Sequence, residues 1–283
     1  MSAELTNLSK EKQRMEHILL KPLLSEAIIE RLIDLGVRDI TKLSIFSSLE
    51  STNDYLLSEV NNFNEVYVCL AEQQTHGRGR YGHQWISPPG CNIYLSMLWP
   101  ISKRQMQYDL LSLWLLLAIA DVLTTYDIKD IQLKWPNDIC VADKKLAGVL
   151  VEQKLGQTNS NLVIGVGLNV AMSKQSSTEL DRPWIDLHII KPDITYSRNE
   201  IAADLLAKFH QTIRDFEDGR LRNLPAKWHH YDMLLDQHIH FLKNERIQEG
   251  IVKGVDDAGN LIIDLDGNIE HFHSADVREI KLN

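Results

Sequence analysis

The residues with the clearest chemical capacity form one glycine- and arginine-rich stretch, residues 72–82, with the sequence Glu-Gln-Gln-Thr-His-Gly-Arg-Gly-Arg-Tyr-Gly. Glycine lets the backbone adopt positive φ angles and approach a ligand closely. Arg78 and Arg80 add two permanent positive charges, which suit the binding of phosphate or carboxylate. A tight surface turn with solvated arginines has the same composition. The loop therefore indicates an anion-binding site only if other segments supply the rest of that site.

The same loop fits the spacing G-x-G-x-x-G, at Gly77, Gly79 and Gly82. This spacing marks a dinucleotide site only where a helix begins at the glycines. Here the chain continues into residues 85–90, Trp-Ile-Ser-Pro-Pro-Gly, and consecutive prolines prevent a helix there. We therefore exclude a Rossmann-type dinucleotide site.

Two further polar clusters border apolar segments. Ser51, Thr52 and Asn53 precede an amphipathic run and predict a helix N-terminus, where hydroxyl groups either cap the helix or bind a polar ligand. Residues 134–138, Lys-Trp-Pro-Asn-Asp, place a cation, an aromatic ring and an acid in one turn. This second cluster is either a plain β-turn or a nucleotide-handling turn, with Asp138 near metal-bound phosphate.

The segment after this turn reads as an antiparallel meander. Its strands are expected at residues 139–141, 145–153 and 162–170, and turn-like residues separate them. The meander would bring Lys145 and Gly148 next to Asp138. It ends on residues 165–169, Gly-Val-Gly-Leu-Asn, whose small side chains would let a ligand lie against the strand.

The remaining pattern supplies the elements that must position these residues. A helix is expected with Ser25 as its N-cap and Gly36 as its stop, and a capping box at 197–200 should open a long helix that ends near Gly219. Other expected elements are strands at 43–46, 66–71 and 92–99 and a buried helix at 110–123. From residue 237 onward, short strands at 238–242, 247–255, 261–265 and 269–272 predict a small β-barrel or sandwich. Histidines at 238, 240, 271 and 273 lack companion ligands at a recognised spacing, so we interpret them as sheet surface.

Composition argues against several classes of partner. A formal net charge of -9 over 283 residues argues against general affinity for nucleic acid or an anionic membrane. The apolar run 110–123 is interrupted by Ser112 and Asp121 and is shorter than the ~20 residues of a bilayer span. Three cysteines without a C-x-x-C pair indicate neither a disulfide framework nor a cysteine zinc site. With no signal-peptide pattern, a cytoplasmic protein is expected.

In their order along the chain, the polar segments resemble the biotin protein ligases. The motifs that carry the resemblance are residues 50–53, 72–82, 134–138, 145–148 and 165–169. The resemblance covers the chain from Leu43 to the C-terminus. It implies an α/β (α+β) fold with a mixed, largely antiparallel sheet and flanking helices, a class II synthetase-like catalytic domain, and a small SH3-like barrel. The expected domains are an N-terminal helical extension at 1–40, a catalytic domain at 41–235 and the SH3-like domain at 236–283.

The resemblance also implies a two-step reaction. Biotin and ATP, with Mg²⁺, give biotinyl-5′-AMP, and a lysine of the biotin carboxyl carrier protein of acetyl-CoA carboxylase then accepts the biotinyl group. Catalysis is assigned to Lys145, Arg78 and Arg80. Biotin binding is assigned to Ser51, Thr52, Asn53, Gln74, Arg78, Gly79, Arg80, Lys145 and Gly148. Binding of ATP or the adenylate is assigned to Arg80, Trp85, Lys134, Asn137, Asp138, Gly165, Gly167 and Asn169, with Mg²⁺ at Asp138.

Two alternatives remain open at this stage. Lipoate–protein ligases share the fold and the chemistry on a related carrier. A biotin-sensing repressor would need an N-terminal winged-helix domain, and only about forty residues precede the first expected strand. His76, Tyr81 and His83 depart from the small or basic residues that relatives more often carry, so loop closure and affinity would differ. The sequence leaves open whether the chain forms a homodimer.

Overall fold

A computed structural model describes residues 22–40, 42–60, 65–101, 108–155, 160–172, 183–243, 246–274 and 277–282. Residues 1–21 of the expected N-terminal extension lie outside this description. The chain divides into two compact units, one formed by residues 1–104 and 144–207 and the other by residues 105–143 and 208–283. The domain boundaries expected at residues 40 and 235 stay a prediction.

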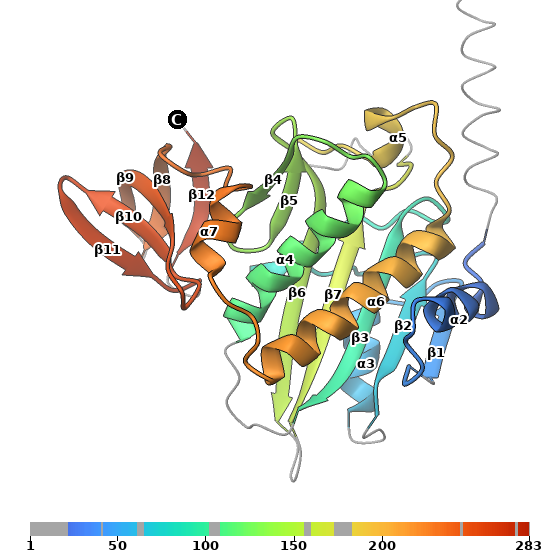
Figure 1. Ribbon diagram of the computed structural model, residues 1–283. Helices are drawn as coiled ribbons and strands as arrows, with labels where there is room; N and C mark the ends of the chain where they lie inside the picture. The colour runs from blue at the N-terminus through green and yellow to red at the C-terminus, as the bar shows by residue number, and fades with distance from the viewer. Residues whose placement is uncertain are drawn as a thin grey trace, which may run out of the picture. The chain divides into compact units, whose positions relative to one another are not determined.

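A twisted sheet forms the centre of the first unit (Figure 1). Its strands run in the order β1-β2-β3-β7-β6. The bounds are Lys42–Phe46 for β1, Tyr67–Ala71 for β2, Ile93–Ile101 for β3, Lys144–Leu155 for β6 and Ser160–Leu168 for β7. β1 pairs with β2 in parallel, whereas the β2–β3, β3–β7 and β6–β7 pairs are antiparallel. The mixed, largely antiparallel sheet expected from the sequence is therefore confirmed.

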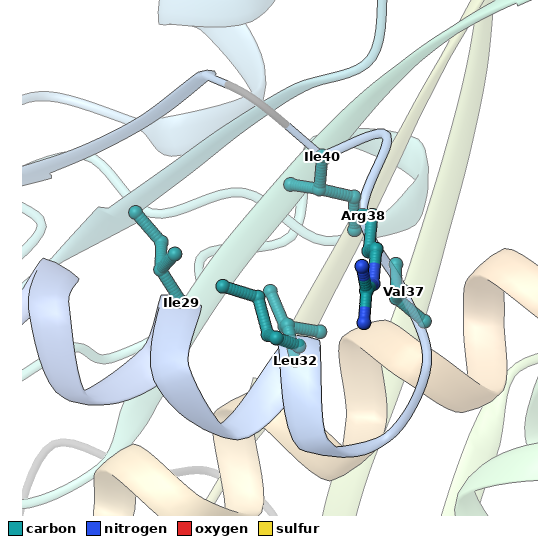
Figure 2. A pocket seen from close by; sticks show the side chains of 6 residues that line it. Ile29, Leu32, Val37, Arg38 and Ile40 are labelled. Atoms are coloured by element: carbon teal, nitrogen blue, oxygen red, sulfur yellow. The ribbon is translucent and has the colours of Figure 1, made fainter.

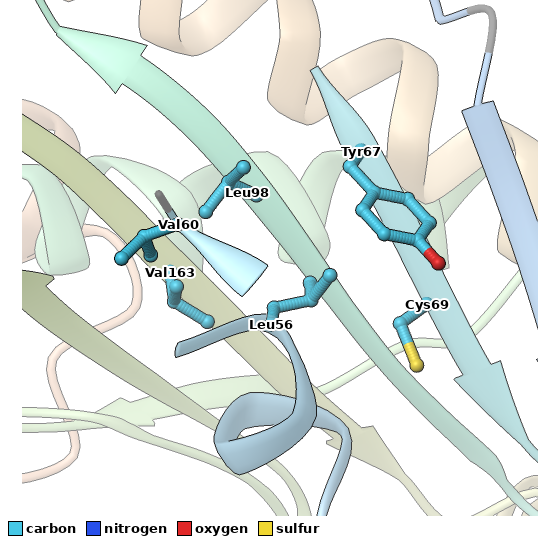
Figure 3. Close-up of a cluster of buried hydrophobic side chains, with 6 residues drawn as sticks. All are labelled: Leu56, Val60, Tyr67, Cys69, Leu98 and Val163. Atoms are coloured by element: carbon cyan, nitrogen blue, oxygen red, sulfur yellow. The ribbon is translucent and has the colours of Figure 1, made fainter. Parts of the chain in front are cut away.

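Helix α3, Thr52–Glu59, packs on β2, β3 and β7 and closes one hydrophobic core. Figure 3 shows this core, in which side chains from the helix and the strands point toward one another. Its fully covered members are Leu56, Val60, Tyr67, Cys69, Leu98 and Val163. Burial of these side chains fixes the start of α3 over the sheet, and this start carries the predicted polar cluster.

Helix α2, Ser25–Asp34, corrects one detail of the sequence analysis. Ser25 already lies in the first turn, and Leu24 is the N-cap residue, without a side-chain capping bond. The Leu24 N–H itself donates to Asn199 Oδ1 at 2.8 Å, which ties the start of the helix to a residue far along the chain. Gly36 does end the helix as expected, with a φ of +82° that favours glycine. A cavity of about 340 Å³ lies beside α2. Figure 2 shows side chains that line it, and none of the lining residues is a predicted site residue.

The other helices that reach the first unit are α5, Leu187–Ile190, and α6, Arg198–Glu217, which runs on into the second unit. The structure contains the first hydrogen bond of the capping box predicted for α6, in which the Glu200 N–H donates to Ser197 Oγ at 3.3 Å. Arg198 is only 5% exposed and forms an ion pair with Glu72 at 2.6 Å. Glu72 also accepts a hydrogen bond from the Leu23 N–H at 2.6 Å. The acid that begins the glycine loop therefore connects the segment just before α2 with the start of α6.

The second unit contains a helix, a hairpin and a small sheet. Helix α4, Tyr108–Thr125, is long and apolar enough to cross a membrane, but 67% of it is buried inside the protein, as in a core helix. The other elements are β4, Ile131–Lys134; β5, Asp138–Val141; α7, Leu224–His229; β8, His238–Lys243; β9, Arg246–Val255; β10, Leu261–Leu265; β11, Asn268–Phe272; and β12, Arg278–Leu282. The last five strands form an antiparallel sheet in the order β11-β10-β9-β8-β12, so the expected small C-terminal β-domain is present. Strand β12 was not predicted from the sequence.

Candidate functional site

The N-terminus of α3 supplies the first part of the candidate site. The Asp54 N–H donates to Ser51 Oγ at 3.3 Å, so the Ser51 hydroxyl caps the helix. Thr52 and Asn53 are each only 4% exposed and point their polar atoms into the protein. The capping interpretation therefore holds for Ser51, whereas Thr52 and Asn53 belong to a larger polar network.

That network joins the helix to the glycine loop. Gln74 Oε1 accepts from the Thr52 backbone N–H at 2.9 Å and from the Thr52 hydroxyl at 3.1 Å. On its other side, Gln74 Nε2 donates to Ser87 Oγ at 3.0 Å. Ser96 Oγ, buried in β3, lies 2.7 Å from Thr52 Oγ1 and 2.6 Å from Asn53 Oδ1. Thr52, Asn53 and Gln74, which the sequence assigned to biotin, are therefore brought together.

Arg78 lies between two carboxylates. Its Nη2 is 2.6 Å from Asp54 Oδ1 on α3 and 2.9 Å from Glu152 Oε2 on β6. Burial acts to lower the pKa of the Arg78 guanidinium, but the carboxylates of Glu152 and Asp54 outweigh it and hold that pKa above its ordinary value. The arginine is therefore permanently charged, and its charge is compensated within the protein.

The rest of the glycine loop folds back on itself. A Cβ on Gly77 would lie 2.5 Å from the Trp85 carbonyl oxygen and 2.7 Å from Ser87 Oγ, so only glycine fits there. Residues Arg80–Gly82 form one turn of 3₁₀ helix, in which Tyr81 has a φ of 55°. The Arg80 guanidinium stacks on the Tyr81 ring at 5.1 Å. No helix follows the loop, as the prolines predicted.

Trp85 lies across the sheet where the sequence predicted a ligand-binding surface. Gly148 on β6 and Gly167 on β7 are directly paired, and a Cβ on either would meet the Trp85 indole, at 3.3 Å and 2.5 Å respectively. The Lys145 ammonium stands over the same ring at 5.0 Å. The indole Nε1 is buried without a hydrogen-bond partner among the described residues. Four predicted residues thus form one group, with the indole seated on the paired glycines.

Asn169 and Gly165 make contacts that support the fold. The Asn169 amide donates to the carbonyls of Lys145 and Ile185, at 3.3 and 3.1 Å, and so links the ends of two segments. A Cβ on Gly165 would lie 2.9 Å from Asn53 Cγ, so this glycine makes room for the asparagine. Their assignment to ATP stays a prediction.

Three predicted residues, Lys134, Asn137 and Asp138, belong to the second unit. Lys134 and Asp138 face each other in the β4–β5 hairpin, and residues 135–137 form its turn. Lys134 Nζ donates to the Ile280 carbonyl at 3.2 Å, and Trp135 Nε1 donates to the Gly259 carbonyl at 3.0 Å. Two side chains of the cluster therefore bind the C-terminal sheet. The assignment of Lys134, Asn137 and Asp138 to ATP binding stays a prediction.

Ser96 and Glu152 belong to the network and were missed in the sequence. Ser96 interrupts the apolar strand Ile93–Ile101, and Glu152 follows the apolar residues 149–151 of β6. A polar residue inside an apolar strand is costly unless it has a partner. This interruption is the signal that could have pointed to both residues.

A cysteine nucleophile does not fit the surroundings. Burial raises the pKa of both the Cys69 and the Cys91 thiol to about 12. Neither thiol forms appreciable thiolate near neutral pH. The arrangement favours chemistry by charge neutralisation and positioning.

Comparison with known proteins decides the family. Residues 45–169 match the Biotin/lipoate A/B protein ligase family, and residues 234–278 match the Biotin protein ligase C terminal domain. The chain is 33% identical over 241 residues to the bifunctional ligase/repressor BirA of Salmonella typhimurium, an alignment that covers 84% of this chain and 74% of the relative. The chain belongs to the biotin protein ligase family. The expected resemblance is thereby confirmed, and the second matched domain favours the biotin branch over the lipoate branch.

Other biotin protein ligases agree with this placement. The biotin--[acetyl-CoA-carboxylase] ligase of Mycobacterium tuberculosis is 29% identical over 247 residues, which cover 85% of this chain and 90% of that protein. Among solved structures, the biotin protein ligase of Aquifex aeolicus in complex with biotin and ATP has a TM-score of 0.71, at 23% identity, over 86% of this chain and 100% of that one. This structural likeness confirms the fold.

Proposed function

We propose that this chain is an ATP-dependent ligase that activates biotin as biotinyl-5′-AMP and transfers the biotinyl group to a lysine of a biotin carboxyl carrier protein. The observation that carries the proposal is the joining of Thr52, Asn53 and Gln74 into one network beside Trp85, Lys145 and the paired glycines, in a chain of this family. The Mycobacterium tuberculosis relative is named for acetyl-CoA carboxylase, which supports the carrier of that enzyme as the acceptor. A cytoplasmic location belongs to the same proposal.

The first step joins two anions. A biotin carboxylate oxygen attacks the α-phosphorus of ATP, the bond to the β-phosphate oxygen breaks, and pyrophosphate leaves. Fixed cations must offset the repulsion between carboxylate and phosphate. We assign this role to Lys145, whose ammonium stands over Trp85, and to Arg80 on the 3₁₀ turn. Trp85 would cover the adenylate and exclude water from the reacting anhydride.

The second step needs no covalent bond to the enzyme. The neutral amine of the carrier lysine attacks the acyl carbon of biotinyl-5′-AMP and loses one proton to solvent as the amide forms. AMP leaves with the electron pair of the broken C–O bond. The high pKa of the buried Cys69 and Cys91 thiols supports a route without a thioester. The enzyme contributes position and charge at this step.

Mg²⁺ would be held through the hairpin turn of the second unit. Asn137 and Asp138 offer an amide oxygen and a carboxylate, the hard ligands that Mg²⁺ prefers. Within the described ranges, no group of three or more His, Cys, Asp and Glu side chains could hold a metal ion. The ion would therefore take most of its other ligands from ATP phosphates and water, and it would neutralise phosphate charge.

One labelling experiment tests the function. The purified chain is incubated with ATP, Mg²⁺ and a carrier domain, with either biotin or lipoate, and the acceptor lysine is examined by mass spectrometry. We expect biotin-dependent modification and little or none with lipoate. Modification by lipoate at an equal or higher rate would replace the proposal by a lipoate ligase. No modification with either acid, by protein shown to be folded, would refute the proposal.

A further inference from the structure

The contacts of Arg78 identify a residue that the sequence did not. Arg78 Nε donates to Asp54 Oδ2 at 2.9 Å, and its Nη2 donates to both oxygens of Glu152, at 3.0 and 2.9 Å. Glu152 stands on β6, Asp54 on α3, and Arg78 on the glycine loop. One guanidinium therefore joins three separate segments of the first unit.

The charge balance of this group matters for the reaction. One positive charge faces two carboxylates, so the group carries a net negative charge. A biotin carboxylate or an ATP phosphate that approached Arg78 would also approach Glu152 and Asp54, and like charges repel at short range. Arg78 is thus unsuited to receive the substrate anions, in contrast to the role that the sequence suggested for it.

Glu152 also decides how the Asn53 amide is oriented. A carboxylate can only accept hydrogen bonds, so the Asn53 NH₂ must face it, and Nδ2 donates to Glu152 Oε2 at 2.8 Å. The Asn53 carbonyl then faces β3, where Oδ1 accepts from the Ser96 hydroxyl at 2.6 Å. Gly165 on β7 leaves room for Asn53 in this orientation, because an added Cβ would lie 2.9 Å from Asn53 Cγ. The orientation of Asn53, next to Thr52 and Gln74, therefore depends on the charge of Glu152.

We infer that Glu152 is a positioning residue for biotin binding, which fastens the glycine loop through Arg78 and orients Asn53, and that Arg78 is a clamp within the protein. The inference rests on the proposed function, because the ligand of Thr52, Asn53 and Gln74 is taken to be the polar head of biotin. It leaves Arg80 and Lys145 as the cations for the substrate anions.

The test is Glu152→Gln, measured by biotin-dependent pyrophosphate exchange and by calorimetric titration with biotin alone. The glutamine amide has the size of the original side chain but cannot form the ion pair with Arg78. Because an amide both donates and accepts hydrogen bonds, it no longer fixes the orientation of the Asn53 amide. We expect the KM and Kd for biotin to rise about tenfold or more, which is the usual effect of losing a hydrogen bond to a charged group. The KM for ATP and the kcat at saturating biotin should change less than about threefold. Glu30→Gln, an exposed acid on α2, is the matched control and should leave all four values unchanged.

Arg78→Gln and the double variant separate a clamp from a substrate contact. If Arg78 is a clamp, Arg78→Gln should resemble Glu152→Gln, and the double variant should be hardly worse than either single variant, because both changes break the same link. A large loss of kcat in Arg78→Gln alone, with effects that multiply in the double variant, would overturn the inference. An unchanged biotin KM with only a lower Tm would also overturn it. If Glu152→Gln does not fold, Arg78→Gln gives the same comparison of kcat with biotin KM. Absence of biotin-dependent exchange in the parent chain would instead reject the proposed function.

Discussion

Replacing Gly167 by alanine should displace Trp85 from the sheet and weaken biotin activation. The added Cβ would lie 2.5 Å from Trp85 Cζ2 and 2.6 Å from Nε1. Carbon atoms in contact prefer about 3.5–4.0 Å, so the indole must move by roughly 1 Å or more. Gly167 is not at a positive φ, so the effect would come from this contact and not from backbone strain.

The size of the effect follows from overpacking. Forcing an extra methyl group into a filled contact costs about 1–3 kcal/mol, which is roughly 5- to 150-fold in a binding or rate ratio. The cost falls on the arrangement in which Trp85 and Lys145 are stacked. We therefore expect kcat/KM for biotin, from pyrophosphate exchange, to fall within that range, while the Tm changes by only a few degrees.

Gly148→Ala is the matched comparison, because Gly148 pairs with Gly167 across the two strands. Its Cβ would meet the flexible end of Lys145 at 3.2–3.3 Å and Trp85 at 3.3 Å, so a shift of a few tenths of an ångström would suffice. The loss should be clearly smaller than for Gly167→Ala. Equal losses, or a larger loss for Gly148→Ala, would refute the idea that the indole is seated on Gly167 in the working enzyme.

Three other changes test the remaining assignments. Lys145→Gln should slow pyrophosphate exchange about 10²–10³-fold, as the loss of one preorganised charged donor does, and should weaken biotin binding less; a rate within a few-fold of the parent would remove Lys145 from catalysis. Arg198→Gln should lower stability by about 3–5 kcal/mol, seen in denaturant unfolding, because it leaves the Glu72 carboxylate without its buried partner. Burial raises the pKa of Asp232 from 3.8 to about 6, so the folded protein binds more protons than the unfolded chain between these values and stability falls as pH rises through them. Asp232→Asn should therefore stabilise the chain by about 3 kcal/mol above pH 7 and much less near pH 4, and an equal gain at both pH values would contradict this reasoning.

Apolar segments of the sequence predicted the sheet and helices well, because their burial follows from the residues within the segment itself. Strand β3 and helix α4 are the clearest cases, as both are apolar over nearly their whole length. Strand β12 escaped prediction because its alternation rests on Ile280 and Leu282 alone. Ser25 was misplaced by one residue, because local capping preferences favour Ser over Leu, whereas Leu24 is the N-cap although its side chain has no oxygen.

The candidate site shows the same division. The family resemblance pointed to Thr52, Asn53 and Gln74 individually, and the pattern of the sequence also placed Thr52 and Asn53 in a polar cluster at the start of a helix. It did not identify Ser96 or Glu152 as their partners, because the alignment of β3 and β6 with α3 is set by tertiary packing. The glycines illustrate a further limit. Gly77 lies in a loop whose composition suits a close approach to a ligand, yet glycine is required there because a Cβ would collide with the Trp85 carbonyl and Ser87.

The cluster at residues 134–138 explains why composition alone cannot separate a ligand contact from a structural one. All five residues suit a nucleotide site, yet Lys134 and Trp135 bind backbone carbonyls of the C-terminal sheet, and Trp135 is only 2% exposed. The Leu133 N–H also donates to the Tyr231 carbonyl at 2.7 Å, and the Met233 N–H donates to the Leu133 carbonyl at 3.0 Å, so β4 is bound to the segment that leads into β8. The turn that presents Asn137 and Asp138 is thus held by the C-terminal sheet on the side of Lys134 and Trp135. Within the second unit, a disturbance of that sheet should reach the proposed ATP side through these bonds, without any contact between the sheet and biotin.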